Sequence, residues 1–337
     1  MTNKDWIRKV LEHDGRVPPP FHLSLSPLAM QQLAQHLGTS DIEHFLDLPL
    51  RMTGMRSIKP LYASPREHGD RVRDEFGVEW ATNDRDRGVP CGPCLTEPCL
   101  SGYTFPDPAA EYRFQHLDEW CRKNATHYTM LWVGDLWERA TFMCSMERLL
   151  VWLATEPGFV ESLLRGITDY ILKTMAILFE RFSFEGIALS DDYGTQRSLL
   201  ISPSAWRRFV RPRLAELFAA AQSANKTVFL HSCGNVRAIV PDLVDLGLDV
   251  LHPIQPEAMD ILELKREFGG QLTFCGGLGT QQVLVEASPE EIRREVHRLQ
   301  YDMGRGGGYI LEPGITVQAD VPLQNILALI DAARIRQ

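Results

Sequence analysis

The 337-residue sequence lacks the features that mark membrane, secreted and nucleic-acid-binding proteins. No apolar run reaches the roughly 20 residues that a membrane-spanning helix needs. Basic residues are outnumbered, with 35 Lys and Arg against 44 Asp and Glu, so the net charge is −9, and nucleic-acid binders are typically basic. Residues 1–6 contain no apolar core of the kind that a signal peptide has. We therefore expect a cytoplasmic protein that acts on a small molecule and has neither a membrane nor nucleic acid as partner.

The chain also lacks internal repeats, low-complexity linkers and an even number of cysteines. Its seven cysteines cannot all pair, and a cytoplasmic protein keeps them as thiols. The composition, with 44% hydrophobic and 23% charged residues, is that of a globular protein. Residues 1–337 are predicted to form a single domain of the size of an α/β barrel, with a homodimer as the expected oligomer.

Five strand–helix units follow one another in the second half of the chain. Each predicted strand is a short apolar run that ends in polar residues, and each following helix shows a capping residue or apolar residues at helical spacing. This alternation is typical of a parallel sheet, and polar residues after each strand mark the working face of a (β/α)8 barrel. The predicted strands are 186–190, 227–231, 250–255, 272–275 and 309–311, and the helices begin near Ser202, Ile239, Ile261, Ser288 and Asn325.

The first half of the chain is less regular. Residues 17–25 and 126–133 are predicted as two more barrel strands, the second followed by helices at 136–153 and 157–182. Residues from about 50 to 110 are rich in Gly, Pro, Asp and Arg, and we interpret them as an insertion or lid over the barrel mouth. The predicted fold class is thus α/β, a distorted (β/α)8 TIM barrel with an N-terminal insertion.

Three cysteines of the predicted lid, Cys91, Cys94 and Cys99, have the spacing of a metal or redox site. They lie in a proline-rich loop with no histidine close by, so we prefer the lid interpretation.

The most informative motif is the run His231-Ser232-Cys233-Gly234-Asn235 at the end of an apolar strand. Side chains alternate along a strand, so His231 and Cys233 point the same way. An imidazole and a thiolate side by side are ligands that zinc prefers. The alternative is a half-buried histidine beside a structural cysteine. Gly234 then lets the backbone turn, which delivers both side chains into a cleft.

Five separated segments carry a family resemblance. They read GIALSDDYGTQ from residue 186, LHSCGNV from 230, HPIQPEAMD from 252, TFCGGLGTQ from 273 and GGGYILEPG from 306. In this order they resemble the uroporphyrinogen decarboxylase superfamily, from about residue 126 to the C-terminus and more faintly before it. The resemblance implies the barrel fold, whereas the reaction differs between branches of such a family.

One branch of that superfamily decarboxylates uroporphyrinogen without a cofactor and holds the substrate carboxylates with arginines near its N-terminus. Guanidinium groups match carboxylates well. The corresponding stretch here, residues 21–26, contains no arginine. Arg51 and Arg56 lie further on and do not match that motif. This departure counts against uroporphyrinogen as the substrate.

The other branch transfers methyl groups from corrinoids and binds zinc through a His-x-Cys pair and a distant cysteine, which the resemblance carries over to His231 and Cys233. Zinc there lowers the pKa of an acceptor thiol. The position of the distant cysteine is filled here by Ile315, which cannot bind a metal. Cys275 is the predicted substitute, because it ends the second strand after that of His231 and alternate strands share a layer in such barrels. Its alternative is a small buried thiol, and Asp192 or Glu312 is an alternative oxygen ligand.

Other polar residues follow the strands. Asp191 and Asp192 point in opposite directions on a strand, and we assign Asp192 to the cleft. Glu312 ends an apolar strand, so Asp192 and Glu312 are the predicted catalytic acids. Tyr193 and Gln255 are predicted to contact substrate.

The predicted function is zinc-dependent transfer of a methyl group between a corrinoid, as cobalamin or on a corrinoid protein, and a small acceptor or donor. His231, Cys233 and Cys275 are the predicted zinc ligands. Two alternatives remain: a cofactor-independent decarboxylase of uroporphyrinogen or another carboxylic acid, and a ligand-binding barrel without catalysis.

Overall fold

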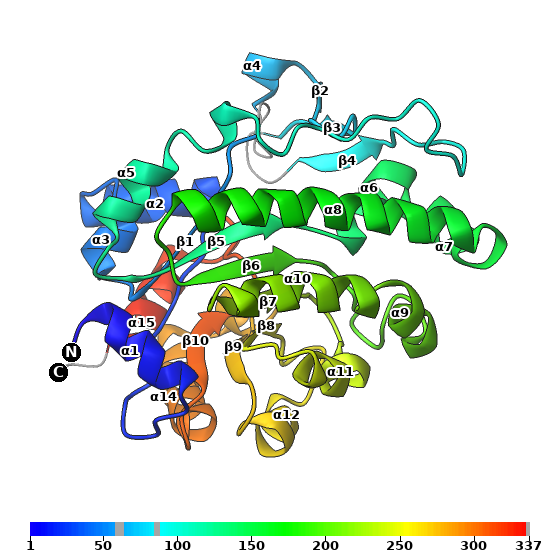
Figure 1. Ribbon diagram of the computed structural model, residues 1–337. Helices are drawn as coiled ribbons and strands as arrows, with labels where there is room; N and C mark the ends of the chain where they lie inside the picture. Colours follow the sequence, from blue (N-terminus) through cyan, green and yellow to red (C-terminus); the bar gives the residue numbers. More distant parts are fainter. Residues whose placement is uncertain (58–63, 84–87, 335–337) are drawn as a thin grey trace.

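The computed structural model describes residues 1–57, 64–83 and 88–334. At its centre is a parallel seven-stranded sheet in the order β1-β5-β6-β7-β8-β9-β10 (Figure 1). The strands are β1 (Leu50–Gly54), β5 (Tyr128–Gly134), β6 (Gly186–Ser190), β7 (Thr227–His231), β8 (Val250–Ile254), β9 (Thr273–Leu278) and β10 (Tyr309–Pro313). The strands follow one another around the sheet in chain order, and helices connect them, so the predicted α/β barrel class is confirmed.

The predicted first strand, residues 17–25, is an extended segment beside β10. Phe21 forms a parallel bridge to Leu311, and Leu25 forms one to Val317. Before the first bridge, Pro18, Pro19 and Pro20 have no N–H to donate, so the segment cannot extend a regular ladder in that direction. The segment therefore takes the place of a first barrel strand without being a regular one.

Helices cover the outside of the curled sheet, with the long helix α8 lying across β5 and β6 in Figure 1. Ser202 and Ser288 cap α9 and α14 as predicted, each accepting a backbone N–H three residues on. The helices are α1 (Asn3–Leu11), α2 (Pro27–Leu37), α3 (Ile42–Leu46), α4 (Pro65–His68), α5 (Leu117–Lys123), α6 (Trp137–Cys144), α7 (Met146–Thr155), α8 (Pro157–Arg181), α9 (Pro203–Phe209), α10 (Arg211–Ser223), α11 (Val240–Asp245), α12 (Ile261–Phe268), α13 (Val283–Glu286), α14 (Pro289–Gly304) and α15 (Leu323–Ala333), with the 3-10 turns η1 (Glu111–Arg113) and η2 (Arg237–Ile239).

Two of the predicted helices are each divided in two. The helix expected over 136–153 breaks at Ser145, whose backbone has φ of 68° and which caps α7. The helix after Ser202 breaks at Val210, because Pro212 cannot donate to the preceding turn. Both breaks lie between helices and leave the predicted order of the strands unchanged.

The predicted insertion from 50 to 110 begins too early. Its first residues form β1, which pairs with β5 as a regular barrel strand. The rest contains α4 and a small antiparallel sheet of β2 (Arg71–Arg73), β3 (Glu79–Ala81) and β4 (Val89–Gly92), seen at the top of Figure 1. Residues 58–63 and 84–87 of the predicted lid lie outside the described residues.

The barrel interior has its own apolar core, which one N-terminal helix closes from below. Every strand contributes a side chain there, and β5 contributes two, Tyr128 and Met130, which pack with Ile7 and Val10 of α1. The strand residues are Leu50, Tyr128, Met130, Ala188, Phe229, Val250, Cys275 and Ile310. The helix fills the end of the barrel away from the polar strand ends, so the interior is a packed core and the other end is left for a site.

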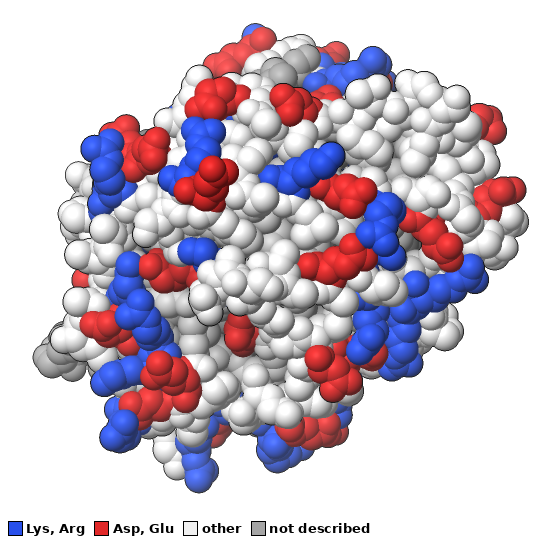
Figure 2. Space-filling view, in the orientation of Figure 1, with Lys and Arg blue, Asp and Glu red and all other residues white. Residues whose placement is uncertain are grey.

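The described part of the chain holds no helix long and apolar enough to cross a membrane. On the face shown in Figure 2, acidic and basic side chains are interspersed over most of the surface, with several basic side chains next to one another at the lower right.

The loops after β6 and β7 meet through two glycines. A Cβ on Gly194 would lie 2.6 Å from Asn235 N and 2.7 Å from Cys233 O, and Gly234 has φ of +81°. Between the loops, Gly194 N donates to Cys233 O at 3.2 Å and Asn235 N donates to Thr195 O at 2.7 Å. This close approach fixes the turn that carries Cys233.

We predict that Gly194→Ala lowers the free energy of unfolding by about 1–3 kcal/mol, because the added methyl group meets backbone atoms that cannot move aside. Urea denaturation followed by circular dichroism measures the change. Gly158→Ala is the matched control, since no atom lies within 4 Å of its Cβ position. Equal stability of the two variants would show that the loops do not touch.

Candidate functional site

A cavity of about 580 Å³ opens at the carboxyl ends of the barrel strands. Strand ends contribute its floor, and the segment after β1, the small sheet and α6 contribute its walls. Asp74, Glu75, Phe76 and Trp80 of the predicted lid segment line it together with the strand-end residues. The strand-end residues are Trp132, Ser190, Asp192, His231, Cys233, His252 and Glu312.

The floor of the cavity is one layer of side chains above the apolar core of the barrel. Side chains alternate along a strand, so the residue two positions after a core residue faces the same interior. Two positions after Phe229, Val250 and Ile310 come His231, His252 and Glu312. Trp132 and Ser190 follow core residues in the same way. The sequence therefore changes from apolar to polar in the same layer of several strands.

Asp192, His231 and Cys233 form the outer group of this floor. The Cys233 Sγ lies 3.5 Å from His231 Nε2, which lies 3.4 Å from Asp192 Oδ1. The Cys233 N–H donates to Asp192 Oδ1 at 2.7 Å, so the turn that presents the thiol also orients the carboxylate. Their three ligand atoms all lie within 4.8 Å of one another.

The outer group has the donor types and spacing of a zinc site. Ligands about 2.0–2.3 Å from a tetrahedral zinc lie about 3.3–3.8 Å apart, which matches the measured separations. Burial opposes ionisation of Asp192, but when the His231 imidazole is charged its hydrogen bond and charge interaction outweigh burial and lower the pKa of the Asp192 carboxyl. All three side chains are partly exposed to the cavity, so a coordination position stays accessible.

His252, Cys275 and Glu312 form an inner group that is buried. Glu312 Oε2 accepts from the Cys275 thiol at 3.0 Å and lies 3.3 Å from His252 Nε2. Its other oxygen, Oε1, accepts from the Ser24 hydroxyl at 2.9 Å and lies 3.1 Å from His22 Nδ1. The carboxylate is thus contacted by four side chains.

Electrostatics in the inner group favour an ionised Glu312. Burial opposes its ionisation, but His22 and His252 outweigh that effect and hold the pKa of Glu312 well below its usual value. Burial also disfavours a charged His22, yet Glu312 raises the pKa of His22. Burial lowers the pKa of His252 and, with Glu312, raises that of Cys275 well above its usual value. The inner group is therefore a His22–Glu312 ion pair with a neutral imidazole and a neutral thiol beside it.

Comparison with known proteins places the chain in a family. The family model described as uroporphyrinogen decarboxylase (URO-D) matches residues 133–335, which include every strand from β6 to β10. The chain belongs to the URO-D family. The match covers both ligand groups.

The relatives of the chain carry the names of two different activities. Methylcobamide:CoM methyltransferase MtaA of Methanosarcina barkeri is 26% identical over 193 residues, which is 57% of this chain and 54% of that protein. Uroporphyrinogen decarboxylase of Thermus thermophilus is 27% identical over 135 residues, which is 39% of this chain and 37% of that protein. The chain thus spans about half the length of MtaA, and less of the decarboxylase. A methyltransferase structure from Methanosarcina mazei shares the fold, with a TM-score of 0.74 at 18% identity over 99% of this chain and 98% of that one.

The structure brings together only part of the predicted zinc set. His231 and Cys233 share the outer group, and Asp192, predicted as an alternative oxygen ligand, completes it. Cys275 lies instead in the inner group, because it pairs with Ile310 in the apolar layer, one layer below Glu312. The prediction that Cys275 joins His231 and Cys233 assumed that β9 and β7 end at the same level of the barrel.

The two residues predicted to contact substrate are not among those that line the cavity. Tyr193 is buried, and its hydroxyl donates to Asp191 Oδ2 at 2.7 Å. Gln255 accepts the Gly234 N–H at 2.5 Å through Oε1. Both residues hold the loops behind the site. Their placement gives them a supporting role in this structure.

Residues not predicted from the sequence also shape the site. His22 and Ser24 reach Glu312 from the irregular first strand, and no local pattern pointed to that contact. Their spacing of two residues on one extended segment, as for His231 and Cys233, is the signal that was available.

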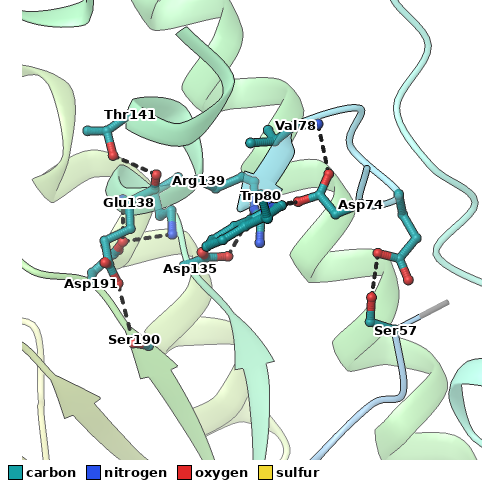
Figure 3. A network of polar contacts seen from close by, with 12 residues as sticks. Ser57, Asp74, Val78, Trp80, Asp135, Glu138, Arg139, Thr141, Ser190 and Asp191 are labelled. Atoms are coloured by element: carbon teal, nitrogen blue, oxygen red, sulfur yellow. Dashed lines mark hydrogen bonds and ion pairs between the residues drawn. The ribbon is translucent and has the colours of Figure 1, made fainter. Parts of the chain in front are cut away.

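Arg139 joins the predicted lid segment to the barrel (Figure 3). Its guanidinium donates to Asp74 Oδ2 at 2.8 Å and to Asp135 Oδ1 at 3.2 Å. Trp80 Nε1 donates to the same Asp74 oxygen at 3.0 Å, and the ring of Phe76 lies 4.3 Å from the Arg139 Cζ atom. Buried pairs of this kind fix the relative position of the segments that carry them.

The Asp191 side chain points away from the cavity and caps the N-terminus of α6. Its Oδ1 accepts the backbone N–H groups of Leu136 at 2.9 Å and Glu138 at 3.0 Å. Burial raises the pKa of Asp191 to about 7, against hydrogen bonds from Glu138 and Tyr193 that lower it. Asp191 therefore binds a proton in the folded chain at a pH where the unfolded chain has lost it.

We predict that replacing Asp191 removes part of the pH dependence of stability. Between about pH 4 and 7 the folded state holds the extra proton, so stability from this residue falls as pH rises. The difference in unfolding free energy between wild type and Asp191→Asn, measured in urea, should shift against the wild type by about 1–3 kcal/mol from pH 5 to pH 8. A difference that stays constant with pH would contradict the assignment.

Proposed function

We propose that this URO-D family member is a methyltransferase that uses a zinc ion held by Asp192, His231 and Cys233. The observation that supports the proposal most is the outer group at the floor of an open cavity, in which His231 Nε2 lies from Cys233 Sγ and from Asp192 Oδ1 at the separations of tetrahedral zinc ligands. When bound, zinc would act as a Lewis acid that lowers the pKa of an acceptor thiol.

The side chains of the floor orient the reacting groups. Asp192 is aligned by the Cys233 N–H, and His231 contacts His252 through Nδ1, so neither ligand is free to turn away. The Trp132 ring packs edge-on against the His231 ring, with centroids 6.3 Å apart. The floor is therefore apolar beside His231, and this keeps water from one side of an acceptor bound there.

We propose a corrinoid, free or on a corrinoid protein, as the second substrate. The name of the relative MtaA, methylcobamide:CoM methyltransferase, supports this choice. In the transfer an acceptor thiolate forms a carbon–sulfur bond as the carbon–cobalt bond breaks, and the bonding electron pair stays on cobalt. The thiol proton leaves to solvent. The reverse direction moves the methyl group from a small donor to the corrinoid.

The structure favours methyl transfer over decarboxylation of a substrate with many carboxylates. The 21–26 segment contributes His22 and Ser24 to Glu312 and no arginine to the cavity. Arg51 is buried outside the cavity, where it contacts His127, and Arg139 is held by Asp74 and Asp135. Among the described lining residues, Arg56 and Arg113 are the cations left, alongside six carboxylates.

Cysteine variants test the proposal. Cys233→Ser should lose the bound zinc and reduce methyl transfer between methylcobalamin and a thiol by about 100-fold or more, because a thiolate ligand is removed. Cys275→Ser should keep its zinc, since Cys275 lies in the inner group, and Cys144→Ser is a buried control in α6. Zinc content by mass spectrometry and loss of methylcobalamin absorbance are the measurements.

Two outcomes would contradict the proposal. Zinc retained in full by Cys233→Ser would remove the outer group as the site, and activity unaffected by chelation would remove zinc from the reaction. Turnover of uroporphyrinogen by the wild type at rates above methyl transfer would favour the decarboxylase instead.

A further inference from the structure

We infer that His252 and Glu312 are positioning residues, which set His231 in the tautomer with its proton on Nδ1 and its Nε2 lone pair directed toward Cys233 and Asp192. This inference rests on the proposed function for its purpose. Its geometry stands on the two groups described above, and it assigns a role to buried residues that touch none of the three proposed ligand atoms.

The two groups are joined by a single contact between histidines. His231 Nδ1 lies 2.9 Å from His252 Nδ1, and their ring centroids are 4.9 Å apart. A hydrogen bond between two such nitrogens holds one proton, so one ring donates and the other accepts. The position of that proton decides which nitrogen of each neutral ring carries the remaining lone pair.

When both rings are neutral, two arrangements of the protons are available. In the first, His231 donates from Nδ1, and His252 carries its proton on Nε2, which faces Glu312 Oε2 at 3.3 Å. In the second, His252 donates from Nδ1 and presents a bare Nε2 lone pair to the same carboxylate. His231 then carries its proton on Nε2, facing Asp192 Oδ1 at 3.4 Å.

Burial decides between the arrangements. The side chains of His252 and Glu312 are 10% and 4% exposed, whereas those of His231 and Asp192 are 21% and 37% exposed. A lone pair that faces a carboxylate is repelled more strongly where water cannot screen it. The repulsion in the second arrangement falls on the buried pair, and that in the first falls on the solvated pair. The first arrangement is therefore the stable one.

Contacts to the other carboxylate oxygen of Glu312 fix its orientation toward His252. Its Oε1 is occupied by His22 and Ser24, so Oε2 is the oxygen that remains turned toward His252 and the Cys275 thiol. The Nε2 atom of His252 makes no aligned hydrogen bond. In the first arrangement its proton faces the Glu312 carboxylate, which lies at ion-pair distance. Ligand histidines in metal sites are commonly fixed in this way through their second nitrogen.

The proton shared by His231 and His252 also limits whether the inner group can bind a metal. His252, Cys275 and Glu312 have ligand types of their own. A metal on His252 Nε2 together with one on His231 Nε2 would leave two neutral rings with protons on both facing Nδ1 atoms. The 2.9 Å contact excludes that state, so the two groups do not hold metals together while it is intact.

Nitrogen-15 NMR of the metal-free wild type with labelled histidine reads the tautomers directly. We expect His231 with a protonated Nδ1 and a bare Nε2, and His252 with a protonated Nε2. Signals showing the reverse pair of tautomers would overturn the inference, whatever the protein does with metals.

Two substitutions at His252 give a second readout, the affinity for Co²⁺ measured by titration of its absorbance. His252→Leu removes the acceptor and should weaken binding about 10–100-fold. His252→Asn places an amide oxygen near the former Nδ1 and should restore affinity to within about threefold. Equal weakening in both variants, with tautomers unchanged, would overturn the positioning role. A wild type that shows the expected tautomers but binds no Co²⁺ would contradict the proposed function alone.

Discussion

The ionised carboxylate of Glu312, buried in the barrel, is the group on which the arrangement of the site depends. A charge there is stable only because His22, Ser24, His252 and Cys275 surround it with donors. Loss of one partner from such a buried pair typically costs about 3–5 kcal/mol, since the remaining charge is left uncompensated. This cost ties the irregular first strand to β8, β9 and β10 at the level where the cavity begins.

The outer group depends on the inner one through the contact between His231 and His252. The proposed ligands near solvent are therefore oriented by charged and polar groups that are buried. The same division appears at the cavity wall, where Arg139 and its two aspartates hold the small sheet against α6. Family membership and shared fold agree with this layout, and the spacing of Asp192, His231 and Cys233 supports the proposed metal site without a ligand at Ile315.

The sequence predicted which way side chains point along a single strand. It did not predict contacts that depend on the register between strands. The alternation of side chains was enough to bring His231 and Cys233 together and to turn Asp192 toward the cavity and Asp191 away from it. It could not show that Cys275 pairs with Ile310, one layer below Glu312, because the offset between neighbouring strands is not written in either strand. For the same reason His22 and Ser24 were not foreseen as partners of a residue about 290 positions away. The division of 136–153 at Ser145 has a local cause, a positive φ angle, that periodicity does not report.

The most direct test of the account is anomalous diffraction at the zinc absorption edge from crystals of the wild-type protein. We predict a peak about 2.0–2.3 Å from His231 Nε2 and Cys233 Sγ, with an Asp192 oxygen as the third protein ligand. A zinc peak bound by Cys275, or no peak at the outer group in protein that contains stoichiometric zinc, would contradict it.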